Sequence, residues 1–270
     1  MPECKQRVLL LSHTPDAQAL IALGARLCYA GGNVDKLMEK VSRQDQQAFL
    51  EKLMGMGHES VLEHVSFTFL IEGVSRVLLA QLTRHRIASF SVQSQRYVSY
   101  KDGFSYVVPP AIAALGEDAA AEYRGQMAQM QQWYESWQER LGAAGEKSNE
   151  DARFVLPGAC ETRIMLTMNA RELRHFFALR MCNRAQWEIR ALAESMFALC
   201  YREAPALFAD AGPECLRRGC PEGAKSCGRQ AEMRARREAL LREKQPSGSA
   251  EGRSPVPGAE SHWGSSPMAL

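Results

Sequence analysis

The 270-residue sequence has no hydrophobic run that approaches the roughly 20 apolar residues of a membrane-spanning helix. Its first fifteen residues contain only a four-residue apolar run, which is not the pattern of an export signal. Apolar residues make up 46% of the chain, an ordinary fraction for a globular protein. The sequence therefore predicts a cytoplasmic protein that does not insert into a membrane.

A large excess of charge is also lacking. Lys and Arg total 33 and Asp and Glu total 31, so the formal net charge is +2. Dedicated nucleic-acid binders usually carry a larger basic excess. The balance favours small anionic ligands and no nucleic-acid partner. A nucleic-acid-binding module is the alternative, since arginines can also bind a phosphate backbone, with steep salt dependence.

Eight cysteines are present, but the paired C-x-x-C motif of structural zinc sites is absent. In a reducing compartment we expect the cysteines to remain thiols. Cys215, Cys220 and Cys227 cluster and could begin a zinc site, but no histidine is close by in sequence. His58 and His64 flank two carboxylates, but their spacing is not that of H-E-x-x-H. The prediction is that the protein holds no metal.

Patterns of apolar residues predict an α+β fold, with helices packed on a small, mostly antiparallel twisted sheet. Strands are expected at Val8–Leu11, His64–Ile71, Phe104–Val108 and Arg163–Asn169. Helices are expected over residues 16–30, 34–54, 74–86, 116–141, 149–157 and 169–180, from 185 onward, and over 230–245. The chain has no G-x-G-x-x-G motif, so nothing indicates a Rossmann domain.

One stretch without carboxylates, residues 84–97, gathers three arginines, one histidine and three serines. Arginine forks and serine hydroxyls suit the oxygens of phosphates and carboxylates. In the helix predicted before this stretch, Gln81, Arg84 and His85 stand at i, i+3 and i+4 and would share one face. The pattern indicates a ligand site, and a solvated basic loop is the alternative.

Residues 169–180 form a second polar block, predicted as a helix capped by Asn169. Arg180 continues the apolar stripe of Leu173, Phe176 and Phe177. A guanidinium on a buried face must find an anion or acceptors, because leaving it unpaired costs on the order of several kcal/mol. Its partner is expected to be either Glu188 or an oxygen of a ligand.

These segments together resemble the flavin-dependent thymidylate synthases. The order RHR, seven residues, serine (Arg84–Arg86, Ser94) resembles the defining motif of that family, and Gln95, Arg96 and Tyr97 continue it. Segments similar to further family motifs are H-E-x-x-x-E-H-x-x-F-x-F at 58–69, A-R-x-x-L-P at 152–157 and A-Q-W-E-I at 185–189. The resemblance covers about residues 8 to 225.

This resemblance implies the fold of that family and the reductive methylation of dUMP to dTMP. It also implies methylenetetrahydrofolate as carbon donor, FAD as hydride carrier and NADPH as reductant, in a homotetramer with shared active sites. A catalytically degenerate homologue is the alternative, because Ser91 and Ser60 stand where the family usually has asparagine and threonine.

The resemblance also implies which residues form the site. The flavin-binding positions are Ser60, Glu63, Arg84, His85, Arg86, Ile87, Ser91, Asn169, Arg171 and His175. The dUMP-binding positions are Gln81, Arg84, Ser94, Gln95, Arg96, Arg153, Leu179 and Arg180. His58 is expected to lie against folate and flavin.

Three residues are the expected catalytic set: Arg180, Ser94 and His58. Negative charge must build on the carbonyl side of uracil as C5 becomes nucleophilic, and a fixed cation such as Arg180 would stabilise it. A nucleophilic serine needs an activating base, and the sequence specifies none for Ser94. We therefore expect Ser94 to donate to the dUMP phosphate, together with Gln81, Arg96 and Arg153.

Composition changes near residue 228. Residues 1–228 are expected to form the catalytic domain and residues 229–270 a charged helix and a disordered tail. The last part, Ser247–Leu270, is rich in Gly, Pro and Ser and has too few apolar residues to build a core.

Overall fold

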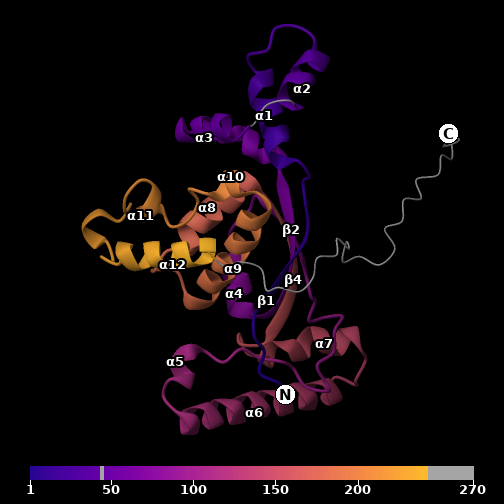
Figure 1. Ribbon diagram of the computed structural model, residues 1–270. Helices are drawn as coiled ribbons and strands as arrows, with labels where there is room; N and C mark the ends of the chain where they lie inside the picture. Colours follow the sequence, from indigo (N-terminus) through magenta and orange to yellow (C-terminus); the bar gives the residue numbers. More distant parts are fainter. Residues whose placement is uncertain (43–45, 243–270) are drawn as a thin grey trace, which may run out of the picture.

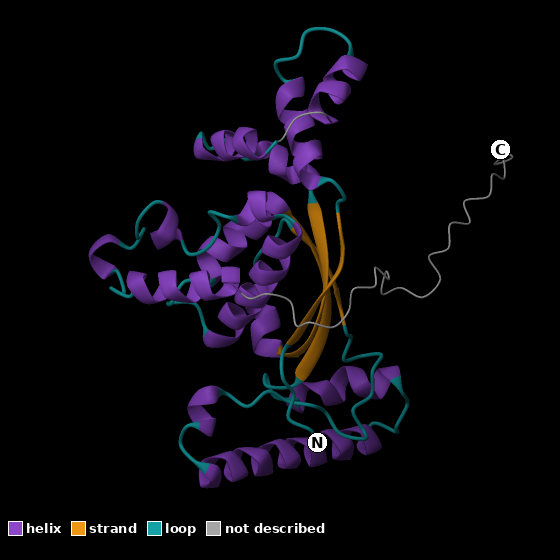
Figure 2. Cartoon of the chain, in the orientation of Figure 1, coloured by secondary structure: helices purple, strands orange, loops and turns teal. Residues whose placement is uncertain are grey.

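The computed structural model describes residues 1–42 and 46–242, and within them the predicted α+β class is confirmed (Figure 1). Four strands form a twisted sheet in the order β1-β2-β4-β3, and every neighbouring pair is antiparallel. A group of helices covers one face of this sheet, and further helices lie beyond both of its ends (Figure 2). The strands are β1 Arg7–His13, β2 Ser66–Ser75, β3 Ala88–Val92 and β4 Glu161–Asn169.

Helices account for most of the remaining elements. The α-helices are α1 Ala17–Leu27, α2 Val34–Ser42, α3 Gln47–Gly55, α4 Arg76–Leu82, α5 Pro110–Ala113, α6 Glu117–Arg140, α7 Glu146–Ala152, α8 Ala170–Arg180, α9 Trp187–Glu203, α10 Pro205–Phe208, α11 Glu214–Arg217 and α12 Gln230–Arg242. Short 3-10 helices are η1 Ser60–His64, η2 Arg153–Val155 and η3 Gly223–Lys225. Among the described residues, none of these helices is long and apolar enough to cross a membrane.

Strands β2 and β4 form the centre of the sheet. Their inward side chains pair across the ladder as Phe67 with Met168 and Phe69 with Leu166, and all four are buried. They pack in one hydrophobic cluster with residues of α8 and α9. Burying each such side chain contributes on the order of 2 kcal/mol. The alternation predicted around residues 64–71 is thus confirmed, and it fixes which face of the sheet carries the helices.

The strand predicted at Phe104–Val108 is wrong. Tyr106 makes only isolated bridges, with Glu3 and Cys160, and its ring packs in a second cluster with α6. The fourth strand is β3, which lies inside the stretch interpreted as a ligand motif. Its alternation of Ala88, Phe90 and Val92 with outward serines is a strand pattern that the many polar groups of that stretch obscured.

Three predicted helices have different bounds. The one expected over 149–157 begins earlier, as α7 Glu146–Ala152, and continues only as the short η2. The helix expected over 34–54 is divided into α2 and α3. The helix expected over 74–86 is shorter, because β2 continues to Ser75 and α4 ends at Leu82. Gly73 allows this extension: its φ is +69°, and a Cβ there would lie 2.0 Å from the carbonyl oxygen of Lys5. Glycine is therefore required where β2 passes the N-terminal segment.

The charged helix predicted over 230–245 is present as α12, described to Arg242. It packs on α9, where Arg236 pairs with Glu194 at 2.8 Å (Nη2 to Oε1) and Met233 is buried. The predicted disordered tail, Ser247–Leu270, lies outside the described residues. The division of the chain into domains at residue 228 stays a prediction.

Candidate active site

The RHR motif forms the turn between α4 and β3. Ser75 caps α4, since its Oγ accepts from the backbone N–H of Leu78 at 3.0 Å. The prediction that Gln81, Arg84 and His85 share one helical face is wrong, because α4 ends before Arg84. Arg84 is exposed, as is Arg86, whereas His85 points inward and is only 5% exposed.

His85 lies between a carboxylate and a guanidinium that both come from α8. Its Nδ1 is 2.9 Å from Oε1 of Glu172, and its Nε2 accepts from Nε of Arg180 at 3.0 Å. Asn169 begins α8 by accepting from the backbone N–H of Glu172 at 2.8 Å. This cap orients Glu172, so the start of α8 determines where Arg180 is held.

Burial lowers the pKa of His85 below 6.5, and the charge of Arg180 lowers it further, whereas the hydrogen bond that His85 donates to Glu172 raises it. The imidazole is therefore neutral at pH 7. Burial also lowers the pKa of Arg180, as does the charge of Arg84, but the group keeps its proton. The alternative partner predicted for Arg180, Glu188, instead accepts from the Ser75 hydroxyl at 2.5 Å and from its N–H at 2.7 Å.

One cavity of about 510 Å³ opens beside η1 and the start of α8. It brings together five of the predicted flavin-binding residues: Glu63, Ile87, Asn169, Arg171 and His175. Its wall also contains Glu59, Glu172, Glu214, Arg217 and Arg218, which the sequence interpretation did not include. Three arginines therefore line this hollow together with four carboxylates, and the arginine forks suit the oxygens of a phosphate.

A second cavity, of about 610 Å³, adjoins the first. The two share His175, Ala178 and Glu214 in their walls. Leu179 and Arg180, the residues predicted to lie against the pyrimidine, line this second cavity. Within residues 1–42 and 46–242, no hydrogen bond or ion pair engages Nη1 or Nη2 of Arg180. The guanidinium is therefore anchored at one nitrogen and can donate from the other two.

Of the residues predicted to hold the dUMP phosphate, Gln81 lies in α4, close to the RHR turn, whereas Ser94 and Arg96 follow the other end of β3. The backbone N–H of Gln93 bonds to Arg163, five residues along β4 from the partner of Ala88, a span of roughly 17 Å. Neither cavity contains Ser94, Gln95, Arg96, Arg153 or Gln81 in its wall. One chain therefore does not bring them together with Arg180.

Ser94, Arg96 and Arg153 make polar contacts within the chain. The Ser94 Oγ accepts from the backbone N–H of Arg96 at 3.2 Å. Arg96 pairs with Glu146 at 2.6 Å and with Glu150 at 3.5 Å. The side chain of Arg153 donates to the carbonyl oxygen of Glu150, not to its carboxylate, at 3.0 Å. Both arginines are thus positioned from α7.

Other predicted residues are exposed. His58 and Ser60 lie at the start of η1 and line neither cavity, although their neighbours Glu59 and Glu63 line the first. Ser91 faces outward from β3, on the side of the sheet without helices. Arg171 pairs with Glu63, which links α8 to η1 across the mouth of the first cavity.

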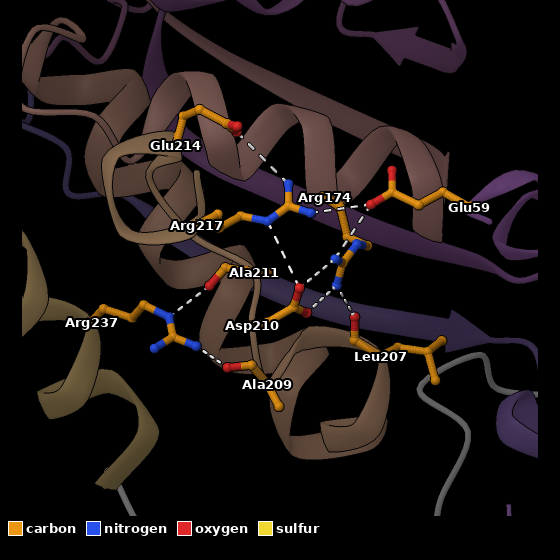
Figure 3. Close-up of polar contacts among 9 residues, drawn as sticks. All are labelled: Glu59, Arg174, Leu207, Ala209, Asp210, Ala211, Glu214, Arg217 and Arg237. Carbon is orange, nitrogen blue, oxygen red and sulfur yellow. Dashed lines mark hydrogen bonds and ion pairs between the residues drawn. The ribbon is translucent and has the colours of Figure 1, made fainter. Parts of the chain in front are cut away.

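A charged network that sequence reasoning missed underlies the first cavity (Figure 3). Arg174 is 1% exposed and donates to both carboxylate oxygens of Asp210, at 2.6 and 2.8 Å, and to the carbonyl oxygen of Leu207. Glu59 lies 3.5 Å from Arg174 and 3.1 Å from Arg217. Through these ion pairs, Glu59, just before η1, is connected to Asp210, which follows α10.

Arg174 could have been found from the sequence. It stands four residues after Ala170 and three before Phe177, both buried, so a charge lies on the buried face of α8. Burial alone would raise the pKa of Asp210, but Arg174 and Arg217 together lower it below its usual value. Asp210 and Arg217 carried no local signal, because only the tertiary fold brings them to α8.

No group of three histidine, cysteine or carboxylate side chains in the described ranges is already arranged to hold a metal ion. The polar side chains around the first cavity are nitrogen donors and carboxylates, of which Glu59 and Glu63 are paired with arginines. They suit an organic anion.

Comparison with known proteins decides the family. The model of the family described as "Thymidylate synthase complementing protein" matches residues 9–206. A flavin-dependent thymidylate synthase from Geobacter sulfurreducens is 54% identical over 231 residues, covering 84% of this chain and 96% of that protein. The chain belongs to the flavin-dependent thymidylate synthase family. The resemblance stated from the sequence motifs is thereby confirmed.

A second relative supports this family assignment, and a solved structure supports its fold. The flavin-dependent thymidylate synthase of Clostridium tetani is 46% identical over 238 residues, covering 84% of this chain and 95% of that one. A crystal structure described as a UMP/dUMP methylase, PolB from Streptomyces cacaoi, bound with 5-Br dUMP, superposes with a TM-score of 0.61. It covers 76% of this chain and 93% of that one at 24% identity, and it supports the shared fold alone.

Proposed function

We propose that this member of the flavin-dependent thymidylate synthases methylates dUMP to dTMP, with methylenetetrahydrofolate as carbon donor and NADPH as reductant. The observation that carries the proposal is the anchored guanidinium of Arg180, which lines a cavity adjoining the one that gathers the predicted flavin-binding residues. Free thiols at all eight cysteines fit a reducing compartment, and we propose a cytoplasmic location.

The first cavity suits FAD. Arg171, Arg217 and Arg218 give it cations for a diphosphate, while His175 and Ile87 offer ring and apolar contacts. FAD, when bound, supplies the hydride acceptor and donor that the reaction needs. Glu59 and Glu63 are already paired with arginines, so they do not leave an unpaired carboxylate facing the phosphates.

Arg180 acts on the pyrimidine in this proposal. The Nε of Arg180 donates to His85, which fixes the orientation of the guanidinium. Its Nη1 and Nη2 can then donate to a uracil carbonyl oxygen. As C5 becomes nucleophilic, negative charge develops on that side of the ring, and the fixed cation stabilises it more than the ground state. Leu179, 47% exposed on the same cavity wall, provides an apolar surface for the ring.

We propose that the phosphate of dUMP is held by Ser94, Gln95, Arg96 and Arg153 of another subunit. The separation of this group from Arg180 within one chain supports a shared site. So does the sheet face without helices, where Ser91, Arg163 and Met165 are exposed. A second copy of the chain covers this face in the proposed homotetramer. The predicted residues that line neither cavity then contact ligands bound by the neighbouring subunit: His58, Ser60, Gln81, Arg84, Arg86 and Ser91.

The test is a spectrum of the full purified chain, followed by anaerobic addition of NADPH with and without dUMP. We expect flavin bands that bleach faster with dUMP, and dTMP when methylenetetrahydrofolate is added. Arg180→Ala should still bind FAD but form dTMP at least ~100-fold more slowly, whereas Arg242→Ala, at an exposed pair with Glu238, should match the original chain. A colourless protein that fails to take up FAD would instead identify a degenerate homologue.

A further inference from the structure

Four cysteines that the proposed reaction does not use line the second cavity. Cys182 follows α8, Cys215 lies in α11, and Cys220 and Cys227 lie on the way to α12. All four are free and partly buried, and they come from two segments far apart in the sequence. The tertiary fold, not a local motif, therefore gathers them.

The four thiols face one shared space. Cys182, Cys215, Cys220 and Cys227 all line the cavity of about 610 Å³. Thiolates gathered in this way would repel one another unless a cation lay between them.

The segment that carries three of these cysteines, 215–227, contains no buried residue. Helix α11 has four residues and η3 has three, and neither contains a buried residue. Its polar contacts are the ion pairs of Arg217 with Glu59, Asp210 and Glu214. In addition, Arg184 donates to the carbonyl oxygen of Lys225 and Gln230 to that of Cys215. Segments that bury so little apolar surface are commonly held by a crosslink or a metal.

We propose that Cys182, Cys215, Cys220 and Cys227 together bind one zinc ion that fixes this wall of the second cavity. Zinc takes four thiolates in a tetrahedron at about 2.3 Å. Binding replaces the four thiol protons, which pass to solvent, and leaves a net charge of −2 on the site. Arg180 and Arg184 line the same cavity and offset that charge.

The site closes around the ion. Because no three such side chains in the described ranges already form a ligand group, the thiols must rotate and the 215–227 segment must move toward Cys182. A cavity of about 610 Å³ leaves room for that movement. Closure would bring a fixed wall beside Leu179 and Arg180, so the ion would shape the cavity without touching the reacting atoms.

The test is the zinc content of the full chain, purified from zinc-supplemented medium and measured by elemental analysis and native mass spectrometry. We expect one zinc per chain, and four cysteines that react with a thiol reagent only after a chelator is added. Cys220→Ser should lose the ion, and Cys220→His should keep it, because histidine is also a zinc ligand. Cys28→Ser, at an exposed cysteine outside the cavity, is the matched control and should keep one zinc.

Several results would overturn the proposal. One is a folded chain without zinc, after exposure to the ion, whose four thiols react as readily as Cys28. Others are disulfides among the four cysteines or an iron–sulfide absorption in place of zinc. Circular dichroism shows whether Cys220→Ser still folds, and Cys220→His tests the site if it does not. Because none of these readouts is dTMP formation, a failure here is distinguishable from a failure of the proposed reaction.

Discussion

The Nε of Arg180 donates to the Nε2 of His85 at 3.0 Å, and this contact fixes both the guanidinium and the tautomer of the imidazole. Since Nε2 accepts, the proton of the neutral ring is on Nδ1, which donates to Glu172 at 2.9 Å. His85 is almost fully buried, so we propose that it acts by positioning Arg180.

Removal of the ring is expected to disturb both partners. His85→Ala leaves the buried carboxylate of Glu172 without its donor and should cost about 2–4 kcal/mol of unfolding free energy. His85→Gln can accept from Arg180 and donate to Glu172, and should lose less. Urea unfolding measures the stabilities. Equal losses for the two variants would contradict the hydrogen-bonding role.

At low pH, protonation of His85 should break its hydrogen bond with Arg180. Protonated Nε2 can no longer accept, so kcat should fall as pH drops from about 6.5 through the lowered pKa of folded His85. Because the folded state holds fewer protons than the unfolded state there, stability should also fall with decreasing pH. A pH–rate profile of His85→Gln provides the comparison: its acid limb should lie at lower pH, and an unchanged limb would assign the decline to another group.

Arg180→Lys preserves the positive charge but loses the fork. A lysine ammonium cannot bond to His85 and donate to a uracil oxygen from two directed nitrogens, so kcat should fall roughly 10- to 100-fold with intact FAD binding. Steady-state kinetics and the flavin spectrum measure the two effects. A variant that keeps full kcat would show that charge alone suffices.

The network below the first cavity should contribute to stability. Asp210→Ala leaves the guanidinium of Arg174, which is 1% exposed, without its bidentate partner. The cost should be about 2–3 kcal/mol, less than for a fully buried pair because Asp210 itself is 53% exposed. Glu238→Ala removes an exposed pair with Arg242 and should cost under about 1 kcal/mol. Denaturant titration distinguishes these outcomes.

Shared sites predict complementation between inactive variants. Arg180→Ala and Arg96→Ala remove groups that one chain keeps apart, so each variant alone should be nearly inactive. Unfolded and refolded together in equal amounts, they should recover activity at about a quarter of the sites. If mixing restores none while both variants assemble normally, the two groups belong to the same chain's site.

Sequence patterns predicted the parts of this fold that depend on local periodicity. The alternation around residues 64–71 and 163–169 determines β2 and β4, because successive strand residues face opposite sides. The order of the RHR, H-E-x-x-x-E-H and A-Q-W-E-I segments was enough to indicate the family. Asn169 also predicted the start of α8, since its side chain serves a neighbouring N–H.

Contacts between distant segments could not be predicted in this way. Both the pairing of His85 with Arg180 and the junction of Arg174 with Asp210 depend on how α8 packs against residues remote in the sequence. The sequence by itself determined the family, the central strands and the residue types of the site. Only the tertiary structure decided which charges are buried, which cysteines meet and which predicted ligands one chain holds apart, because burial and pairing arise from packing between segments.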